Sequence, residues 1–122
     1  MKHTEKTVLV YGLSPVQLLQ LHAVFQTLGI RCVAVTDSMT ACRVDELLEG
    51  THTAGVPGIP LLGRFALLAG FAGRESEAIT ALNRVAPGII KAVRTETNGS
   101  WRFLDLCAEI AEENRYMMNR RK

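Results

Sequence analysis

One stretch of the chain, Arg94-Thr95-Glu96-Thr97-Asn98-Gly99-Ser100-Trp101, gathers side chains that could do chemistry. The hydroxyls of Thr95 and Thr97 and the Asn98 amide could hydrogen-bond a polar ligand. Glu96 could serve as an acceptor or a base, and Trp101 could supply a flat apolar wall. The stretch joins an expected strand end to an expected helix start, which is where open α/β sheets tend to bind ligands.

The same residues also have a purely structural interpretation. Asn98-Gly99 is a common turn sequence and Ser100 is a good helix cap. We predict that Trp101 is chiefly structural and clamps the last helix onto a sheet face, in which case its replacement by alanine should cost about 3–5 kcal/mol.

A second candidate is an anion site at Ala72-Gly73-Arg74, where a strand is expected to lead into a helix. Free backbone N–H groups, the helix dipole and the Arg74 guanidinium could together hold an anion. Neither G-x-G-x-x-G nor G-x-x-x-x-G-K-[ST] is present, so a solvated Arg74 paired with a carboxylate is the competing interpretation. The candidate ligand-binding residues are therefore Thr95, Glu96, Thr97, Asn98, Trp101 and Arg74.

The other reactive side chains are scattered along the chain. Cys32, Cys42 and Cys107 show neither a C-x-x-C pair nor zinc-ligand spacing, so we interpret them as reduced thiols and expect no metal and no cofactor. His22 and His52 have no partner at a catalytic or ligating spacing. No G-x-S-x-G or H-E-x-x-H motif occurs, so the motifs indicate no enzyme class.

Charge and apolar patterning bear on the partners. The formal net charge is +2, part of which comes from the last four residues, and this is a weak case for nucleic acid. The last helix carries an acidic stripe, which is either a solvated face or a surface for a basic partner, such as a second copy's tail. Exposed edge strands and the apolar end of that helix favour a homodimer. The stripe comprises Asp105, Glu109, Glu112 and Glu113, and the apolar end comprises Tyr116, Met117 and Met118.

The elements that must position these residues form two similar halves. An apolar run at 7–11, a helix with a capping box at Ser14 to Gln17 and a C-terminal glycine at Gly29, and a strand at 31–36 predict a β-α-β unit over residues 7–36. A strand at 65–70, a helix at 75–85 and a strand at 89–94 predict a second unit over 65–95. A helix over 100–118 follows.

A constant shift along the sequence aligns the two halves without a gap and matches Leu9 with Leu67 and Gly12 with Gly70, which suggests a duplication. The connecting segment, residues 37–64, has a short helix at 43–49 and then an irregular loop rich in glycine and proline. Its length favours a crossover, which would make the four-stranded sheet mostly parallel with the first and third strands central. An elaborated hairpin would instead give a ferredoxin-like α+β sandwich with an extra C-terminal helix.

The sequence therefore predicts one α/β domain over residues 1–122 with helices on both faces of the sheet. Hydrophobic residues make up 48% and charged residues 21%, as in ordinary globular domains. No apolar run could cross a bilayer and no signal-peptide core is present, so we expect a cytoplasmic protein with no membrane association.

The chain resembles a family of short bacterial proteins known as domain of unknown function DUF3783 over most of its length, and most distinctively over its last third. The resemblance rests on Ile90-Lys91-Ala92-Val93-Arg94-Thr95-Glu96-Thr97-Asn98, followed by Trp101, Leu104, Leu106, Glu109 and Glu112-Glu113. The family carries no established activity. What the resemblance implies is that Thr95, Glu96, Thr97, Asn98 and Trp101 are the residues to test first.

We therefore expect a non-catalytic module that binds a small polar or anionic ligand or another protein through the surface around Thr95 to Trp101. The alternative is a small enzyme in which Glu96 is the general base and Arg74 or Arg94 holds an anionic substrate.

Overall fold

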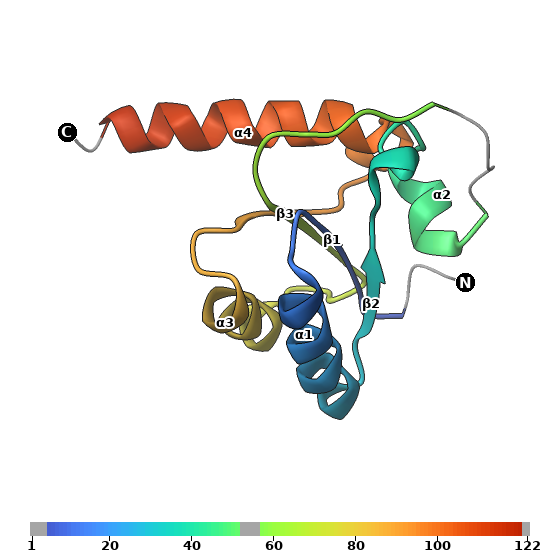
Figure 1. Ribbon diagram of the computed structural model, residues 1–122, viewed down its shortest axis with the longest axis vertical. Helices are drawn as coiled ribbons and strands as arrows, with labels where there is room; N and C mark the ends of the chain where they lie inside the picture. The colour runs from blue at the N-terminus through green and yellow to red at the C-terminus, as the bar shows by residue number, and fades with distance from the viewer. Residues whose placement is uncertain (1–4, 52–56, 121–122) are drawn as a thin grey trace.

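A computed structural model describes residues 5–51 and 57–120, the last three by their backbone alone (Figure 1). Its strands are β1 (Thr7–Tyr11), β2 (Arg31–Ala34), β3 (Phe65–Ala69) and β4 (Ile90–Val93). Its helices are α1 (Pro15–Leu28), α2 (Val44–Glu49), α3 (Ser76–Val85) and α4 (Phe103–Arg120), with short 3-10 turns η2 (Asp37–Met39) and η3 (Asn98–Ser100). No helix in the described part of the chain is long and apolar enough to span a bilayer.

Local sequence signals set the ends of the helices. The Ser14 hydroxyl accepts a hydrogen bond from the Gln17 N–H, and the Gln17 side chain accepts one from the Ser14 N–H. Gly29 ends α1 and Gly50 ends α2 in the left-handed conformation, with φ angles of 71° and 74°. The predicted capping box and both helix stops are confirmed, whereas α4 begins at Phe103 and not at residue 100.

The strands form one sheet in the order β2-β1-β3-β4. The α/β class, the four strands and the central positions of β1 and β3 are confirmed. Each β-α-β unit is parallel, but β1 and β3 run antiparallel, so the sheet is mixed instead of mostly parallel. It is not ferredoxin-like either, because there each edge strand runs antiparallel to its central neighbour.

The connecting segment explains the difference. The chain leaves β2 and enters β3 at the same end of the sheet, where Tyr11 lies opposite Phe65 and Ala34 is paired with Val10. Residues 37–64, whose number suggested a crossover, instead form η2, α2 and the loop before β3. The predicted irregular loop falls partly on residues 52–56, which lie outside the described residues.

The rest of that loop is held by side chains of the sheet end. The Ile59 N–H donates to the Thr40 hydroxyl at 2.8 Å, and the Leu61 N–H donates to the Tyr11 hydroxyl at 2.7 Å. The Tyr11 hydroxyl in turn donates to the Asp37 carboxylate. A Cβ on Gly58 would lie 1.9 Å from the Asp37 carbonyl oxygen, so this close approach requires glycine.

A local two-fold axis relates the halves. Leu9 pairs directly with Leu67, its equivalent in the gapless alignment, so the axis passes between them, normal to the sheet. The edge strands depart from that alignment, because Thr7 pairs with Arg31 whereas Phe65 pairs with Ile90, one position later than the alignment gives. The gapless alignment is therefore correct for the central strands and wrong by one position for the edge strands.

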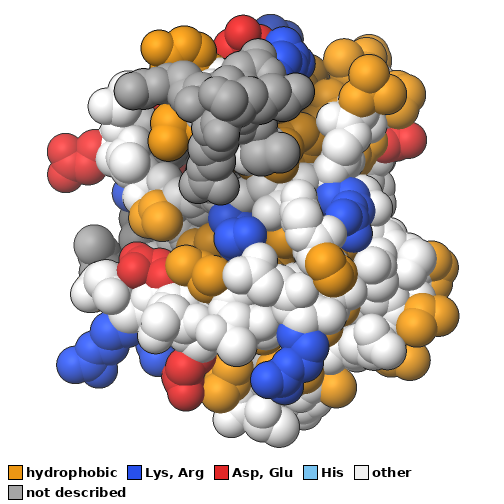
Figure 2. All heavy atoms as spheres, turned by 90° about the vertical axis from the view of Figure 1, so that its left-hand side faces the viewer, with side chains coloured by type: hydrophobic (Ala, Val, Ile, Leu, Met, Phe, Trp, Pro, Cys, Tyr) orange, Lys and Arg blue, Asp and Glu red, His pale blue; other side chains and the backbone are white. Residues whose placement is uncertain are grey.

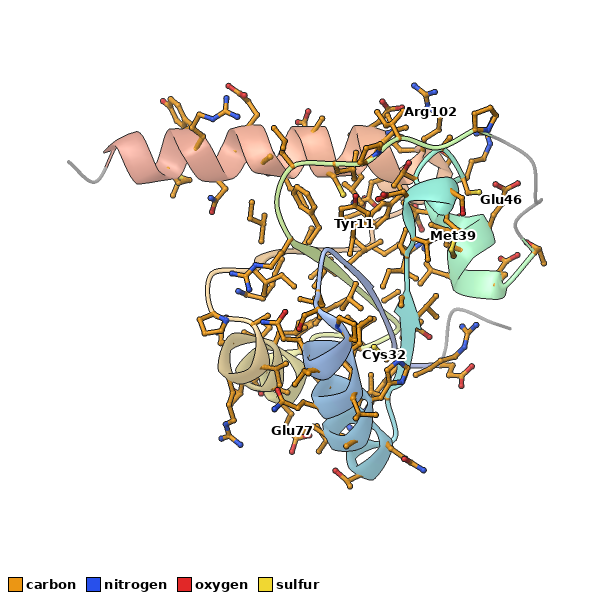
Figure 3. The ribbon with its side chains drawn as sticks, in the orientation of Figure 1. Tyr11, Cys32, Met39, Glu46, Glu77 and Arg102 are labelled. Carbon is orange, nitrogen blue, oxygen red and sulfur yellow. The ribbon has the colours of Figure 1, made fainter. Side chains whose placement is uncertain are left out.

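A core layer lies on each face of the sheet. In Figure 1, α1 and α3 lie on one side of the strands and α4 lies on the other. Val8, Val10 and Phe25 belong to the layer under α1 and α3, and Leu9 and Phe103 to the layer under α2 and α4. Figure 3 shows Cys32 on the α1 side and Tyr11 on the α4 side. The predicted cover of both faces, with the last helix opposite the other two, is confirmed.

Candidate functional site

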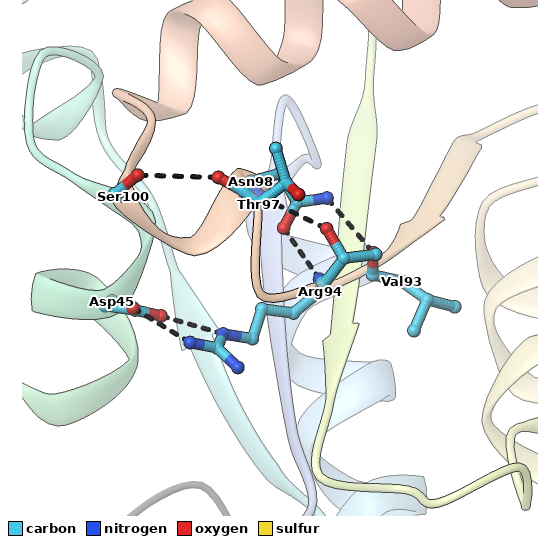
Figure 4. A network of polar contacts seen from close by, with 7 residues as sticks. Asp45, Val93, Arg94, Thr97, Asn98 and Ser100 are labelled. Atoms are coloured by element: carbon cyan, nitrogen blue, oxygen red, sulfur yellow. Dashed lines mark hydrogen bonds and ion pairs between the residues drawn. The ribbon is translucent and has the colours of Figure 1, made fainter.

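The Asn98 side chain binds the backbone at the end of edge strand β4 (Figure 4). Its Nδ2 donates to the Val93 carbonyl at 3.2 Å, and its Oδ1 accepts from the Thr95 N–H at 2.8 Å. The Asn98 N–H donates to the Thr95 hydroxyl at 3.1 Å. Asn98 is buried, and its side-chain amide and the Thr95 hydroxyl are thus bonded to backbone groups of the segment itself.

An ion pair ties the same segment to α2. Arg94 Nε and Nη2 donate to the two Asp45 carboxylate oxygens, each at 2.9 Å. This bidentate contact raises the pKa of Arg94 above its ordinary value. A Cβ on Gly99 would lie 2.7 Å from both Asp45 oxygens, so Gly99 gives the carboxylate room to reach Arg94.

Backbone bonds extend this junction. The Val44 N–H donates to the Trp101 carbonyl at 2.9 Å, and the Phe103 N–H donates to the Cys42 carbonyl at 2.8 Å. The Arg43 guanidinium donates to the Ser100 carbonyl at 2.9 Å. Hydrogen bonds from residues before and after Trp101 therefore connect the start of α4 to the start of α2.

Trp101 lies between two hollows. One, of about 360 Å³, runs along β4 and is lined by Lys91, Ala92, Val93, Thr95, Thr97, Asn98, Trp101, Leu106, Glu109, Ile110 and Glu113. The other, of about 490 Å³, is lined by Arg43, Ser100, Trp101, Arg102, Asp105 and Glu109. The indole is half-buried against the core layer under α4, so one part of the ring packs inward while another part stays accessible.

The first hollow has an apolar floor and an acidic wall. Leu106 and Ile110 of α4 line it together with Trp101, and Glu109 and Glu113, one helical turn apart on the same helix, line it too. No salt bridge among the described side chains involves Glu109 or Glu113, whereas Glu112 pairs with Arg115 at 2.8 Å. The site can therefore offer an aromatic face beside two carboxylates that form no ion pair with another described side chain.

The structure brings four of the six predicted site residues together: Thr95, Thr97, Asn98 and Trp101 line the same hollow. Glu96 is exposed and does not line it, although its charge acts on Arg94. Arg74 is exposed in the turn after β3, where its N–H donates to the Phe71 carbonyl, and it too lies outside this hollow.

Sequence reasoning missed Asp45 altogether. Its partner Arg94 lies 49 positions away along the chain, and no local pattern pairs them. Lys91 belongs to the family signature but is not among the predicted site residues. Its ammonium donates to Asn83 Oδ1 at 2.8 Å and to the Ile89 carbonyl at 3.0 Å, which places it on the α3 side of the strand.

Cys42 and Cys107 are buried in the core, and Cys32 is half-buried against it, so none of the thiols lines the first hollow. Burial raises the pKa of Cys32 to about 11 and that of Cys107 to about 12, and it also raises the pKa of Cys42. All three are free cysteines. The described residues contain no group of three or more His, Cys, Asp or Glu side chains that could hold a metal ion.

Fold and site together define a small two-unit α/β domain whose second unit ends in an edge-strand cap, a half-buried indole and an acidic helix. Over residues 64–117, which run from β3 into the last turns of α4, the chain matches the family described as Domain of unknown function (DUF3783). The predicted resemblance to that family is confirmed. No curated protein and no solved structure matches the chain.

Proposed function

We propose that the chain is a non-catalytic protein-interaction module that binds its partner through the Trp101 surface, defined as Thr97, Trp101, Leu106, Glu109, Ile110 and Glu113. The observation that carries this proposal is the half-buried indole standing between two hollows. A rigid aromatic side chain held by its own backbone, with apolar and polar neighbours around it, is the usual anchor of a protein interface.

The hydrogen-bond inventory favours a protein partner over a small polar ligand. The Asn98 amide and the Thr95 hydroxyl already bond to backbone groups, so a ligand would have to break those bonds to use them. The surface that remains combines apolar side chains with the Glu109 and Glu113 carboxylates, while Arg43 and Arg102 line the second hollow. It suits a broad contact better than a few directed polar bonds.

The charges favour a partner with basic side chains beside apolar ones. Glu109 and Glu113 have no salt-bridge partner among the described side chains and adjoin the indole. A Lys or Arg side chain on a partner could pair with these carboxylates and stack over Trp101. The same carboxylates would repel a phosphate backbone, which argues against nucleic acid.

The enzyme alternative has less support. Glu96 is exposed outside the hollow, and Arg94 is committed to Asp45. Arg74 lies in the turn after β3 and does not share a hollow with the signature residues. A general base and an anion holder around one enclosed substrate position are therefore not assembled.

We further propose a bacterial, cytoplasmic setting. The bacterial setting follows from the resemblance to DUF3783. Three free thiols, two of them buried, suit a reducing compartment. As a partner we propose a second copy of the chain in addition to the protein bound at the Trp101 surface.

Trp101 is the single tryptophan of the chain and serves as an intrinsic probe. We expect synthetic peptides in which Lys or Arg alternates with Leu to shift its fluorescence, and added salt to weaken the binding. The double variant Glu109→Gln/Glu113→Gln should reduce the affinity at least tenfold. The matched control Glu112→Gln, which alters a carboxylate already paired with Arg115, should leave it nearly unchanged.

A thermal-shift screen with metabolites and nucleotides separates the alternatives, because a ligand at 100 times its dissociation constant adds about 2.7 kcal/mol. If a small molecule stabilises the protein and is turned over, and Glu96→Gln abolishes the turnover, the enzyme alternative would be favoured over the interaction module. Equal peptide affinities for the double variant and its control would refute the Trp101 surface.

A further inference from the structure

The two edges of the sheet differ in how they are protected. The N–H groups of Arg31 and Val35 donate inward, toward the β1 side of the sheet, at 2.8 Å in both cases. Because alternate residues of a strand point their N–H and C=O groups to opposite sides, Cys32 and Ala34 direct theirs away from the sheet. Within the described part of the chain, no hydrogen bond fills these outward groups.

The opposite edge, β4, is blocked at both ends. The outward carbonyl of Val93 accepts from Asn98, and the outward carbonyl of Ile89 accepts from the Lys91 ammonium. Between these two caps, the backbone groups of Lys91 and the Val93 N–H accept or donate no hydrogen bond with any described residue. A charged side chain and occupied carbonyls on an edge strand are devices that discourage pairing with another strand.

Helix α1, which flanks β2, is free of charge. Its sequence PVQLLQLHAVFQTL contains no Asp, Glu, Lys or Arg, and yet Val16 is 64% and Leu19 is 74% exposed. By contrast, α3 carries Glu77 and Arg84. Figure 2 shows basic and acidic side chains scattered between separate apolar patches on the side of the molecule that lies at the left of Figure 1. Depletion of charge next to a bare strand edge is typical of a surface that another chain covers.

We propose that two copies of this chain pair antiparallel through their β2 edges, about a two-fold axis at Val33, to form a continuous eight-stranded sheet. In that register Cys32 faces the partner's Ala34 and Ala34 faces the partner's Cys32. Both are hydrogen-bonded pairs, so all four outward groups of each copy are used. The two α1 helices then lie next to each other on one face.

The register also places no like charges directly opposite each other. Cys32 and Ala34 are small and uncharged, and the Arg31 guanidinium is already bonded to the Leu48 carbonyl of its own chain at 2.6 Å. Pairing through β4 would be worse in each symmetric register. A two-fold axis at Lys91 would place the two Lys91 ammonium groups opposite each other. A two-fold axis at Ala92 or at Val93 would require the Val93 carbonyl, which already accepts a hydrogen bond from Asn98.

Proline substitutions on the two edges test the proposal. Ala34→Pro removes an outward N–H that the sheet does not use, and Val93→Pro does the same on β4, so circular dichroism should show both variants folded. We expect sedimentation at tens of micromolar to give twice the chain mass of 13.4 kDa for the parent protein and for Val93→Pro. Ala34→Pro should sediment as a monomer.

Two further variants keep the test decisive if Ala34→Pro does not fold. Leu19→Glu changes a side chain that is 74% exposed and should also give a monomer. Val33→Cys, in a Cys32→Ser background, should form an intermolecular disulfide on mild oxidation, because residues on the axis form a non-hydrogen-bonded pair with Cα atoms about 4.5 Å apart. Its control is Ala92→Cys, the equivalent position of β4.

A monomeric parent protein at these concentrations would overturn the proposal. So would a dimer that survives both Ala34→Pro and Leu19→Glu, or equal cross-linking of Val33→Cys and Ala92→Cys. Peptide binding at the Trp101 surface is measured separately, so loss of the dimer and loss of that function are distinguishable.

Discussion

Asn98 stands beside Val93 as the next strand of the sheet would. Its Nδ2 donates to the Val93 carbonyl at 3.2 Å, while its Oδ1 accepts from the Thr95 N–H at 2.8 Å. One amide thus bonds to residues on both sides of Arg94, as a peptide group of a parallel neighbour does. The asparagine of the family signature therefore ends the sheet, and this explains its presence without any ligand.

Asn98→Ala should destabilise the fold by about 2–4 kcal/mol, because it leaves a carbonyl and an N–H without their partner. Asn98→Asp keeps an acceptor for the Thr95 N–H but places a charged oxygen against the Val93 carbonyl. We therefore expect Asn98→Asp to lower the free energy of unfolding as well, by less than Asn98→Ala does. Urea unfolding measures both. A negligible loss of stability for Asn98→Ala would show that water replaces the amide at no cost.

The local signals in the sequence were sufficient for the elements and the core. The capping residues of α1, the glycines after α1 and α2, and the alternation of Val8 with Leu9 all follow from short-range physical chemistry. Even the repeat carried three-dimensional information, since it matched Leu9 with Leu67, the residue that lies opposite it.

Long-range geometry was not accessible in the same way. The length of the connecting segment does not determine whether the chain crosses to the opposite end of the sheet before β3 begins. The antiparallel pairing of β1 with β3 was therefore not predicted. The bidentate contact of Arg94 with Asp45 depends on where α2 packs. The signature could be recognised as distinctive, but its structural role required the positions of Val93 and Asp45.

Gly99, which follows the signature asparagine, makes a second prediction. Gly99→Ala should cost about 1–3 kcal/mol, because the new Cβ would lie 2.7 Å from the Asp45 oxygens and push the carboxylate away from Arg94. In an Asp45→Ala background the same change should cost much less, so a double-mutant cycle should give a clearly non-zero coupling between the two positions. Additive costs would mean that Gly99 is required for another reason.

Stability should fall at alkaline pH through Cys107. Burial raises the pKa of this thiol from 9.0 to about 12, so the folded protein keeps the proton that the unfolded chain releases. The contribution is fully present below about pH 9 and is lost as the pH rises toward 12. At pH 10 the loss should be about 1 kcal/mol relative to pH 8.

Cys107→Ala isolates this effect from those of the other titrating groups. The variant has a packing deficit that does not depend on pH, so its stability deficit relative to the parent protein should shrink by about 1 kcal/mol between pH 8 and pH 10. Urea titrations at the two values measure the deficit. A deficit that stays constant would mean that the thiol ionises as easily in the folded protein as in the unfolded chain.

Trp101 separates the structural and functional interpretations of the signature. A fully buried tryptophan would lose about 3–5 kcal/mol on replacement by alanine. Here the indole is half-buried and precedes α4, and its position is fixed by the Val44 N–H donating to the Trp101 carbonyl at 2.9 Å, a bond that every side chain permits. We therefore expect Trp101→Ala to cost only about 1–2 kcal/mol and Trp101→Phe less than about 1 kcal/mol.

Binding should respond more strongly than stability. Calorimetric titration with the basic peptides should show at least a tenfold loss of affinity for Trp101→Ala and a partial recovery for Trp101→Phe, because phenylalanine still offers an aromatic face to a Lys or Arg side chain. A stability cost of about 3–5 kcal/mol with unchanged peptide affinity would assign Trp101 to the core. A small stability cost with lost affinity would place it at the interface.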